Sequence, residues 1–161
     1  MLKTVKSKLR FQTGYIMKYL LTTFLTLGML SSIFAQDGKV VAVAIGVKDM
    51  NCNGSSYRTH LSYSWQSGTD YNYCISSAKE SIRANYSGID DIYTKYGKGN
   101  YMVILKSDKK YESWSASCDK DHYAVGIGMD AKTAWEKAKN DLPWTWSERD
   151  GYQILVDQPI R

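Results

Sequence analysis

Acidic residues are absent from the first 36 positions of this 161-residue chain, and their absence explains its formal net charge of +5. The five basic residues of that stretch are Lys3, Lys6, Lys8, Arg10 and Lys18, so 21 − 5 = 16 Lys and Arg remain to balance the 16 Asp and Glu. A neutral chain of mixed sign lacks the clustered cations that dominate binding to phosphates. We therefore expect no nucleic-acid partner.

Long apolar runs are missing after residue 36. No later run approaches the roughly 20 apolar residues needed to cross a membrane, so no transmembrane span is expected there. The main candidate run, Tyr19–Leu30, follows Met17 and Lys18 and leads into small residues that end at Ala35. This order is typical of a secretory signal peptide.

The signal peptide divides the chain into two parts. Residues 1–35 are interpreted as a signal peptide with an upstream extension, and cleavage is expected between Ala35 and Gln36. Residues 36–161 have a length typical of one domain. We expect them to form a single compact α+β domain that is secreted or periplasmic.

Cysteine and histidine are scarce. The chain has three cysteines, Cys52, Cys74 and Cys118, two histidines and no C-x-x-C motif, so neither a metal site nor another cofactor is predicted. In an oxidising compartment two of the cysteines would pair, and the sequence leaves all three pairings open.

Hydrophobic periodicity predicts six strands and two helices. The polar caps Ser77 and Asp130 open the two helices. Short turns between strands favour an antiparallel sheet of about six strands with both helices packed on one face. The similar stretches "SSAKESIRA" and "MDAKTAWEKA" are consistent with a weakly duplicated strand–helix unit. The strands are expected at 40–47, 59–65, 101–106, 111–118, 122–128 and 152–156, and the helices at 78–86 and 131–142.

The stretch "KDMNCNGSSYRTH" begins like a calcium-binding loop, because Asp49, Asn51 and Asn53 alternate before Gly54. The twelfth position of such a loop needs a bidentate Glu, and here it is His60. Asn and Gly suit a hairpin turn that requires positive backbone angles. We therefore predict a turn in place of a calcium site.

The stretch "GIGMDA", residues 126–131, matches the phosphate-binding turn of dinucleotide-binding units. Asp130 would place a carboxylate where the pyrophosphate must lie, at a helix N-terminus that favours anions. A Gly-rich turn between a strand and a helix is the preferred interpretation.

Cys118 and His122 flank a predicted turn and could act as a nucleophile and its base. A small Cys/His hydrolase is therefore one alternative function. A disulfide at Cys118 would remove the thiolate that this chemistry needs.

Phenylalanine is absent after residue 34, whereas all five Trp and most Tyr residues lie beyond it. Trp144 and Trp146 alternate in "PWTW", and Tyr71 and Tyr96 fall in segments expected to be loops. Exposed Tyr and Trp commonly anchor binding surfaces. The favoured function is an exported, non-enzymatic binding or interaction module with a protein or carbohydrate ligand.

Two short segments also carry a family resemblance. "SGTDY", residues 67–71, and "YTKYGKG", residues 93–99, are similar to the Ser-Gly-x-x-Tyr and Tyr/Lys-Gly loops of bacterial periplasmic lysozyme inhibitors. The resemblance implies inhibition of a lysozyme-like enzyme as a further alternative. The two predicted helices depart from the all-β architecture of that family.

The signal-peptide interpretation predicts that exported protein begins at Gln36. Intact-mass measurement of the secreted or periplasmic fraction should give the mass of residues 36–161. A mature species that retains Met17–Ala35 would mean that the apolar run is an anchor.

Overall fold

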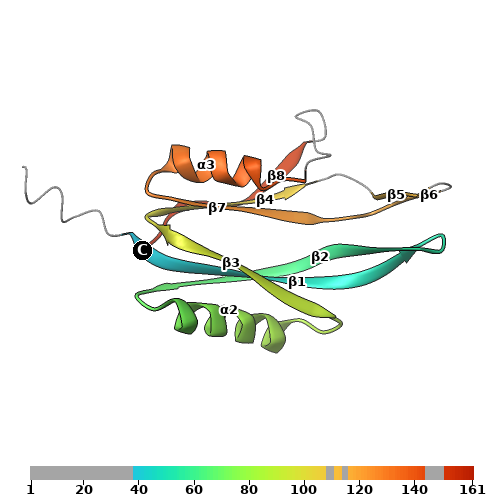
Figure 1. Ribbon diagram of the computed structural model, residues 1–161, viewed down its shortest axis with the longest axis horizontal. Helices are drawn as coiled ribbons and strands as arrows, with labels where there is room; N and C mark the ends of the chain where they lie inside the picture. The colour runs from blue at the N-terminus through green and yellow to red at the C-terminus, as the bar shows by residue number, and fades with distance from the viewer. Residues whose placement is uncertain (1–37, 108–110, 114–115, 144–150) are drawn as a thin grey trace, which may run out of the picture. The chain divides into compact units, whose positions relative to one another are not determined.

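The computed structural model describes residues 38–107, 111–113, 116–143 and 151–161, and the chain from Gly38 onward forms one compact unit. The described residues have an α+β fold, with two helices, two antiparallel three-stranded sheets and a small hairpin (Figure 1).

The first sheet contains β1 (Lys39–Cys52), β2 (Ser55–Gly68) and β3 (Asp91–Gly99). Its order is β2-β1-β3, and β1 is antiparallel to both neighbours. Helix α2 (Tyr71–Asn85) connects β2 to β3 and packs against this sheet.

The second sheet contains β4 (Tyr101–Ser107), β7 (His122–Gly128) and β8 (Tyr152–Pro159), in the order β7-β4-β8. Helix α3 (Ala131–Asn140) follows β7 and packs on β7 and β4. A hairpin of β5 (Tyr111–Ser113) and β6 (Ala116–Cys118) lies between β4 and β7 in the chain.

The main core lies between the two sheets. Alternate residues of β1, including Val41, Val43 and Ile45, pack there with Met102 and Ile104 of β4. The intervening β1 residues, such as Ala42 and Ala44, face α2, and on β4 Val103 and Leu105 face α3. Both central strands are thus covered on both faces, which explains their continuous apolar sequences.

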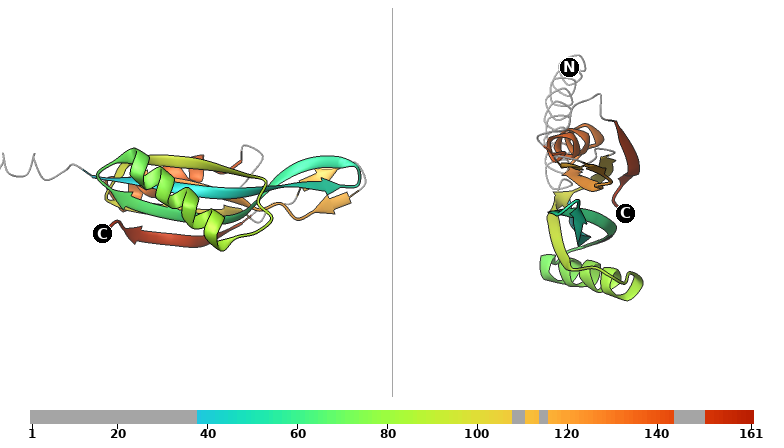
Figure 2. Two further views of the ribbon diagram at one scale, coloured as in Figure 1. Left: turned by 90° about the horizontal axis from the view of Figure 1, so that it is seen from below. Right: turned by 90° about the vertical axis from the view of Figure 1, so that its right-hand side faces the viewer.

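The expectation of one six-stranded sheet with both helices on one face is not what the structure shows. The strands divide into two sheets, and each helix covers the outer face of a different sheet, as the end-on view shows (Figure 2). Sequence periodicity indicates that a strand is covered on both faces. It does not indicate whether a helix or another sheet covers it.

The two halves of the unit repeat one plan. Each consists of two antiparallel strands, a helix that crosses over the sheet, and a third strand on the other side of the first. The N-cap aspartates Asp70 and Asp130 accept hydrogen bonds from Tyr73 N–H and Thr133 N–H, each at 2.7 Å. Buried residues then follow at the same spacing of four: Cys74, Ala78 and Ile82 in the first half, and Ala134, Ala138 and Leu142 in the second.

Three local predictions need correction. The first helix begins at Tyr71, with Asp70 as its cap in place of Ser77, because burial of Cys74 extends the apolar stripe by one turn. The polar segment before residue 100 is strand β3, although its glycines had indicated a loop. Residues 111–118 are not one strand, since Tyr111 pairs with Cys118 across a hairpin.

The predicted hairpin turn is confirmed at Asn53 and Gly54, with φ angles of 48° and 84°. These are the positive angles of a two-residue turn between twisted strands.

The predicted single disulfide is also present: Cys52 at the end of β1 is bonded to Cys118 of β6, and Cys74 is a buried free thiol. The bond joins the two repeated halves.

The Gly-rich stretch before α3 serves close packing. A Cβ atom on Gly126 would overlap the Ala134 carbonyl oxygen and lie 2.5 Å from the Ala138 nitrogen. Gly128 is similarly close to the helix backbone, with a Cβ position 2.5 Å from the Ala134 nitrogen. The stretch is the strand-to-helix turn that the sequence favours over a dinucleotide site.

Gly126→Ala is therefore expected to destabilise the fold by about 3 kcal/mol, at the upper end of typical overpacking costs, because backbone atoms must move. Gly97→Ala is the matched control: its Cβ would meet Ile127 at an ordinary 3.7 Å. Chemical denaturation of both variants measures the difference. Equal stability of the two variants would contradict the close-packing account.

Candidate functional site

The face of α2 beside β3 carries four residues spaced by four, Tyr71, Ile75, Lys79 and Arg83. Residues at this spacing lie along one side of a helix. Tyr71 contacts β3, and Lys79 and Arg83 line a pocket with the other end of β3. We call this line of contact the α2–β3 seam.

Two residues predicted to bind ligand meet at one end of the seam. The rings of Tyr71 and Tyr96 are 5.4 Å apart, edge to face. Tyr71 and Ile75 are half-buried against the cluster formed by Val40, Ala42 and Cys74, and Tyr96 is 61% exposed. The two tyrosines come from a helix and a strand, and not from the loops that the sequence suggested.

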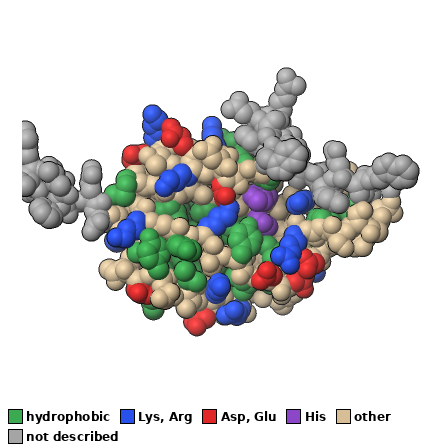
Figure 3. Space-filling view, in the orientation of Figure 1, with side chains coloured by type: hydrophobic (Ala, Val, Ile, Leu, Met, Phe, Trp, Pro, Cys, Tyr) green, Lys and Arg blue, Asp and Glu red, His purple; other side chains and the backbone are tan. Residues whose placement is uncertain are grey.

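A polar pocket of about 450 Å³ lies at the other end of the seam. Two basic side chains of α2, Lys79 and Arg83, face a wall formed by the loop and the start of β3. In Figure 3, apolar side chains gather over β3, and Lys and Arg side chains lie below them over α2. The rest of the lining is Tyr86, Gly88, Ile89, Asp90, Asp91 and Ile92.

The equivalent seam of the second half is bridged by a hydrogen bond. Counting from the N-cap aspartates, Trp135 of α3 takes the place of Ile75, and its indole N–H donates to Asp157 of β8 at 3.2 Å. The strand registers place Asp157 where Tyr96 lies in the first half. The first seam thus has Ile75 where the second has Trp135 on the helix. On the strand it has the Tyr96 ring where the second has Asp157.

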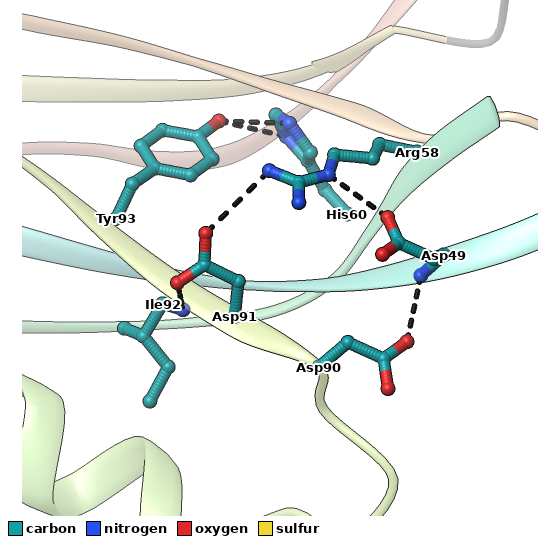
Figure 4. A network of polar contacts seen from close by, with 7 residues as sticks. All are labelled: Asp49, Arg58, His60, Asp90, Asp91, Ile92 and Tyr93. Carbon is teal, nitrogen blue, oxygen red and sulfur yellow. Dashed lines mark hydrogen bonds and ion pairs between the residues drawn. The ribbon is translucent and has the colours of Figure 1, made fainter.

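A network of charged groups holds the start of β3 against the β1–β2 hairpin. Arg58 Nε donates to Asp49 Oδ1 at 2.8 Å, and its Nη1 lies 3.5 Å from Asp91 Oδ2. Figure 4 shows the Asp91 carboxylate turned toward Arg58 and the Ile92 side chain turned toward α2. The Asp49 backbone N–H donates to Asp90 Oδ2 at 2.7 Å. Both pocket carboxylates therefore have partners outside α2.

His60 is a packed residue between the two halves. The Tyr123 backbone N–H donates to His60 Nδ1 at 2.7 Å, which leaves the ring proton on Nε2, 2.8 Å from the Tyr93 hydroxyl (Figure 4). Burial, followed by the nearby His122, Lys95 and Lys120, lowers the pKa of His60 to about 3. The ring is therefore neutral at physiological pH.

His122 stacks on His60 with ring centroids 4.5 Å apart, and its Nε2 lies 3.2 Å from the Asp141 carbonyl oxygen. Burial lowers the pKa of His122, and the Asp141 carbonyl partly opposes this effect. The Asp141 carboxylate accepts from Lys95 Nζ and from the Val125 N–H. This cluster joins β2, β3, β7 and the end of α3.

The Cys/His alternative requires a free Cys118 thiolate beside His122. Cys118 is instead bonded to Cys52. Within the described segments, no group of three or more His, Cys, Asp or Glu side chains is arranged to hold a metal ion.

Trp144 and Trp146, the other predicted binding residues, lie outside the described residues, as does the predicted signal peptide. Among the helices that the structure describes, none is long and apolar enough to cross a membrane.

Comparisons with protein-family models, curated proteins and solved structures found no match to the chain. Its function therefore has to be inferred from its own residues.

Sequence reasoning missed Ile75, Lys79 and Arg83 as site residues. Their spacing of four from Tyr71 was a usable signal, but only for a helix that begins at Tyr71 with Asp70 as its cap. Starting the helix near residue 78 placed Tyr71 outside it.

Neutral His60 should make stability depend on pH. The pKa of His60 is about 6.5 in the unfolded chain and about 3 in the folded protein. The contribution of the neutral ring to the free energy of unfolding is therefore complete above about pH 6.5, and it is lost as the pH falls toward 3. Between pH 7.5 and pH 5 we expect a loss of about 2 kcal/mol from this group, at about 1.4 kcal/mol per pH unit below 6.5.

Denaturant unfolding at the two pH values measures this loss. His60→Asn supplies an acceptor for the Tyr123 N–H without a titrating ring, so its stability should change less with pH than that of the native chain. An equally steep change in the variant would assign the pH dependence to other groups.

Proposed function

We propose that the mature chain is an exported, non-enzymatic binding module that holds a protein or carbohydrate ligand at the α2–β3 seam. The observation that carries this proposal is the Tyr71–Tyr96 pair, in which the exposed Tyr96 ring stands on a half-buried one. Tyrosine combines a large apolar surface with a polar hydroxyl, and such residues are frequent anchors of binding interfaces.

The repeated architecture supports a role for this seam. In the second half, Trp135 occupies the helix position that corresponds to Ile75, and its indole N–H donates a hydrogen bond to Asp157. The first half has Ile75 there and leaves Tyr96 61% exposed. The same plan therefore has a hydrogen-bonded tryptophan in one seam and an exposed tyrosine ring in the other.

Export is supported by the signal-peptide pattern and by the Cys52–Cys118 bond, since disulfides persist mainly in oxidising compartments. A binding role is also supported by the contacts of Cys118 and His60, whose side chains are both engaged within the protein. Cys118 is in the bond, and both ring nitrogens of His60 contact protein groups.

Tyr96→Ala should weaken ligand binding by at least tenfold, because truncating an aromatic anchor costs about 2 kcal/mol or more. Suitable probes are peptides selected on the native protein from a random heptapeptide display library and oligosaccharides selected from a bacterial glycan array. Biosensor titration of the selected probes gives the affinities.

Tyr73→Ala is the matched control. Tyr73 is also 61% exposed and lies on α2, but it is two residues from Tyr71 and so on another side of the helix. Binding to this variant should change less than twofold, with both variants melting near the native temperature. Probes that bind native protein and Tyr96→Ala equally would refute the site.

A further inference from the structure

The seam combines an aromatic end with a basic pocket, and we propose that its ligand is an acidic peptide segment of another protein. An apolar or aromatic side chain of that segment would contact Tyr71 and Tyr96, and a carboxylate would contact Lys79 and Arg83. This proposal rests on the proposed function, because it names the ligand class of the same site.

The charge of the pocket favours an anion. Lys79 and Arg83 both line it, and the Lys48 ammonium lies 4.0 Å from the position of a Cβ atom on Gly88, at the same rim. Among the described residues, neither Lys79 nor Arg83 forms an ion pair. The basic groups of α2 are therefore available to a ligand.

The acidic residues of the pocket do not cancel this charge locally. Asp91 Oδ1 accepts from the Ile92 N–H at 2.8 Å, and its Oδ2 is directed at Arg58 (Figure 4). Asp90 Oδ2 accepts from the Asp49 N–H. Both carboxylates are oriented by groups of β1, β2 and β3, which leaves the α2 side of the pocket basic.

The two ends of the seam are separated by a distance that suits an extended peptide. From Tyr71 to Lys79 the helix advances eight residues, or about 12 Å at 1.5 Å per residue. From Tyr96 to Ile92 the strand spans four residues, or about 13 Å at roughly 3.3 Å per residue. An extended ligand would reach both ends with side chains four residues apart.

Between the two ends, the helix presents half-buried Ile75 and the strand presents half-buried Thr94. This stretch is less polar than the pocket and continuous with the Tyr71 side. A free phosphate ion could use the basic end alone, whereas a peptide with both groups gains from both ends. Charge complementarity and spacing together select the peptide.

The test uses fluorescein-labelled Ser-Phe-Ser-Thr-Ser-Glu-Ser, in which Phe and Glu are four residues apart, and residues 36–161 as secreted. Fluorescence anisotropy at low salt measures its affinity. Replacing the peptide Glu by Gln should weaken binding about tenfold, since charge-assisted hydrogen bonds are roughly twice as strong as neutral ones. Moving Glu next to Phe should weaken binding to a similar extent.

On the protein, the double variant Lys79→Gln, Arg83→Gln should also bind the Glu peptide about tenfold more weakly and bind the Gln peptide as the native chain does. Lys139→Gln is the matched control, because Lys139 lies nine residues after Asp130, as Lys79 lies nine residues after Asp70. It removes a positive charge from the equivalent place on the other helix and should change affinity less than twofold.

Equal affinity for the Glu and Gln peptides would overturn the proposal. So would complete displacement of the Glu peptide by inorganic phosphate at a phosphate concentration at which the Gln peptide stays bound. Self-association that buries Tyr96 at the concentrations of the assay, measured by sedimentation, would assign the seam to a second copy and would also overturn it. Loss of ligands with Tyr96→Ala but no effect of Lys79→Gln, Arg83→Gln would leave the binding module standing and remove only the acidic-peptide assignment.

Discussion

The apolar layer between the two sheets is the interaction on which the rest of the fold depends. Strands β1 and β4 each direct alternate residues, such as Val43 and Ile104, into this layer. Their opposite faces must then be covered by helices, because an apolar strand face exposed to water is unfavourable. This requirement places α2 and α3 on opposite outer faces and fixes two equivalent helix–strand seams, one in each half.

The function that we propose arises from a difference between these equivalent seams. In the second seam the Trp135 indole N–H donates to Asp157, whereas the first seam has Ile75 at that helix position and the exposed Tyr96 on the strand. The two seams thus differ in side-chain volume at one repeated helix position, without any additional loop or domain. The basic residues at the end of α2 then give the first seam a charge preference.

Polar contacts join the two halves at the end of the sheets that carries the hairpins. The His60 backbone N–H donates to the Asp121 carbonyl, the His60 ring accepts from the Tyr123 N–H, and Cys52 is bonded to Cys118. Cys118, which first suggested catalysis, therefore takes part in joining the two halves. A buried neutral histidine can satisfy a backbone donor of one sheet and a hydroxyl of the other with one ring.

The sequence alone determined the elements whose signal is local: the apolar strands of β1, β4 and β7, the Asn53–Gly54 turn, the Asp130 cap and the presence of one disulfide. Only the tertiary structure decided that there are two sheets, that Cys74 remains unpaired, and that Tyr71 and Tyr96 meet beside Lys79. Periodicity records how strongly each face of an element is buried, but not which element buries it. The partners of a face, and hence a site shared by a helix and a strand 25 residues apart in sequence (96 − 71), follow from long-range packing.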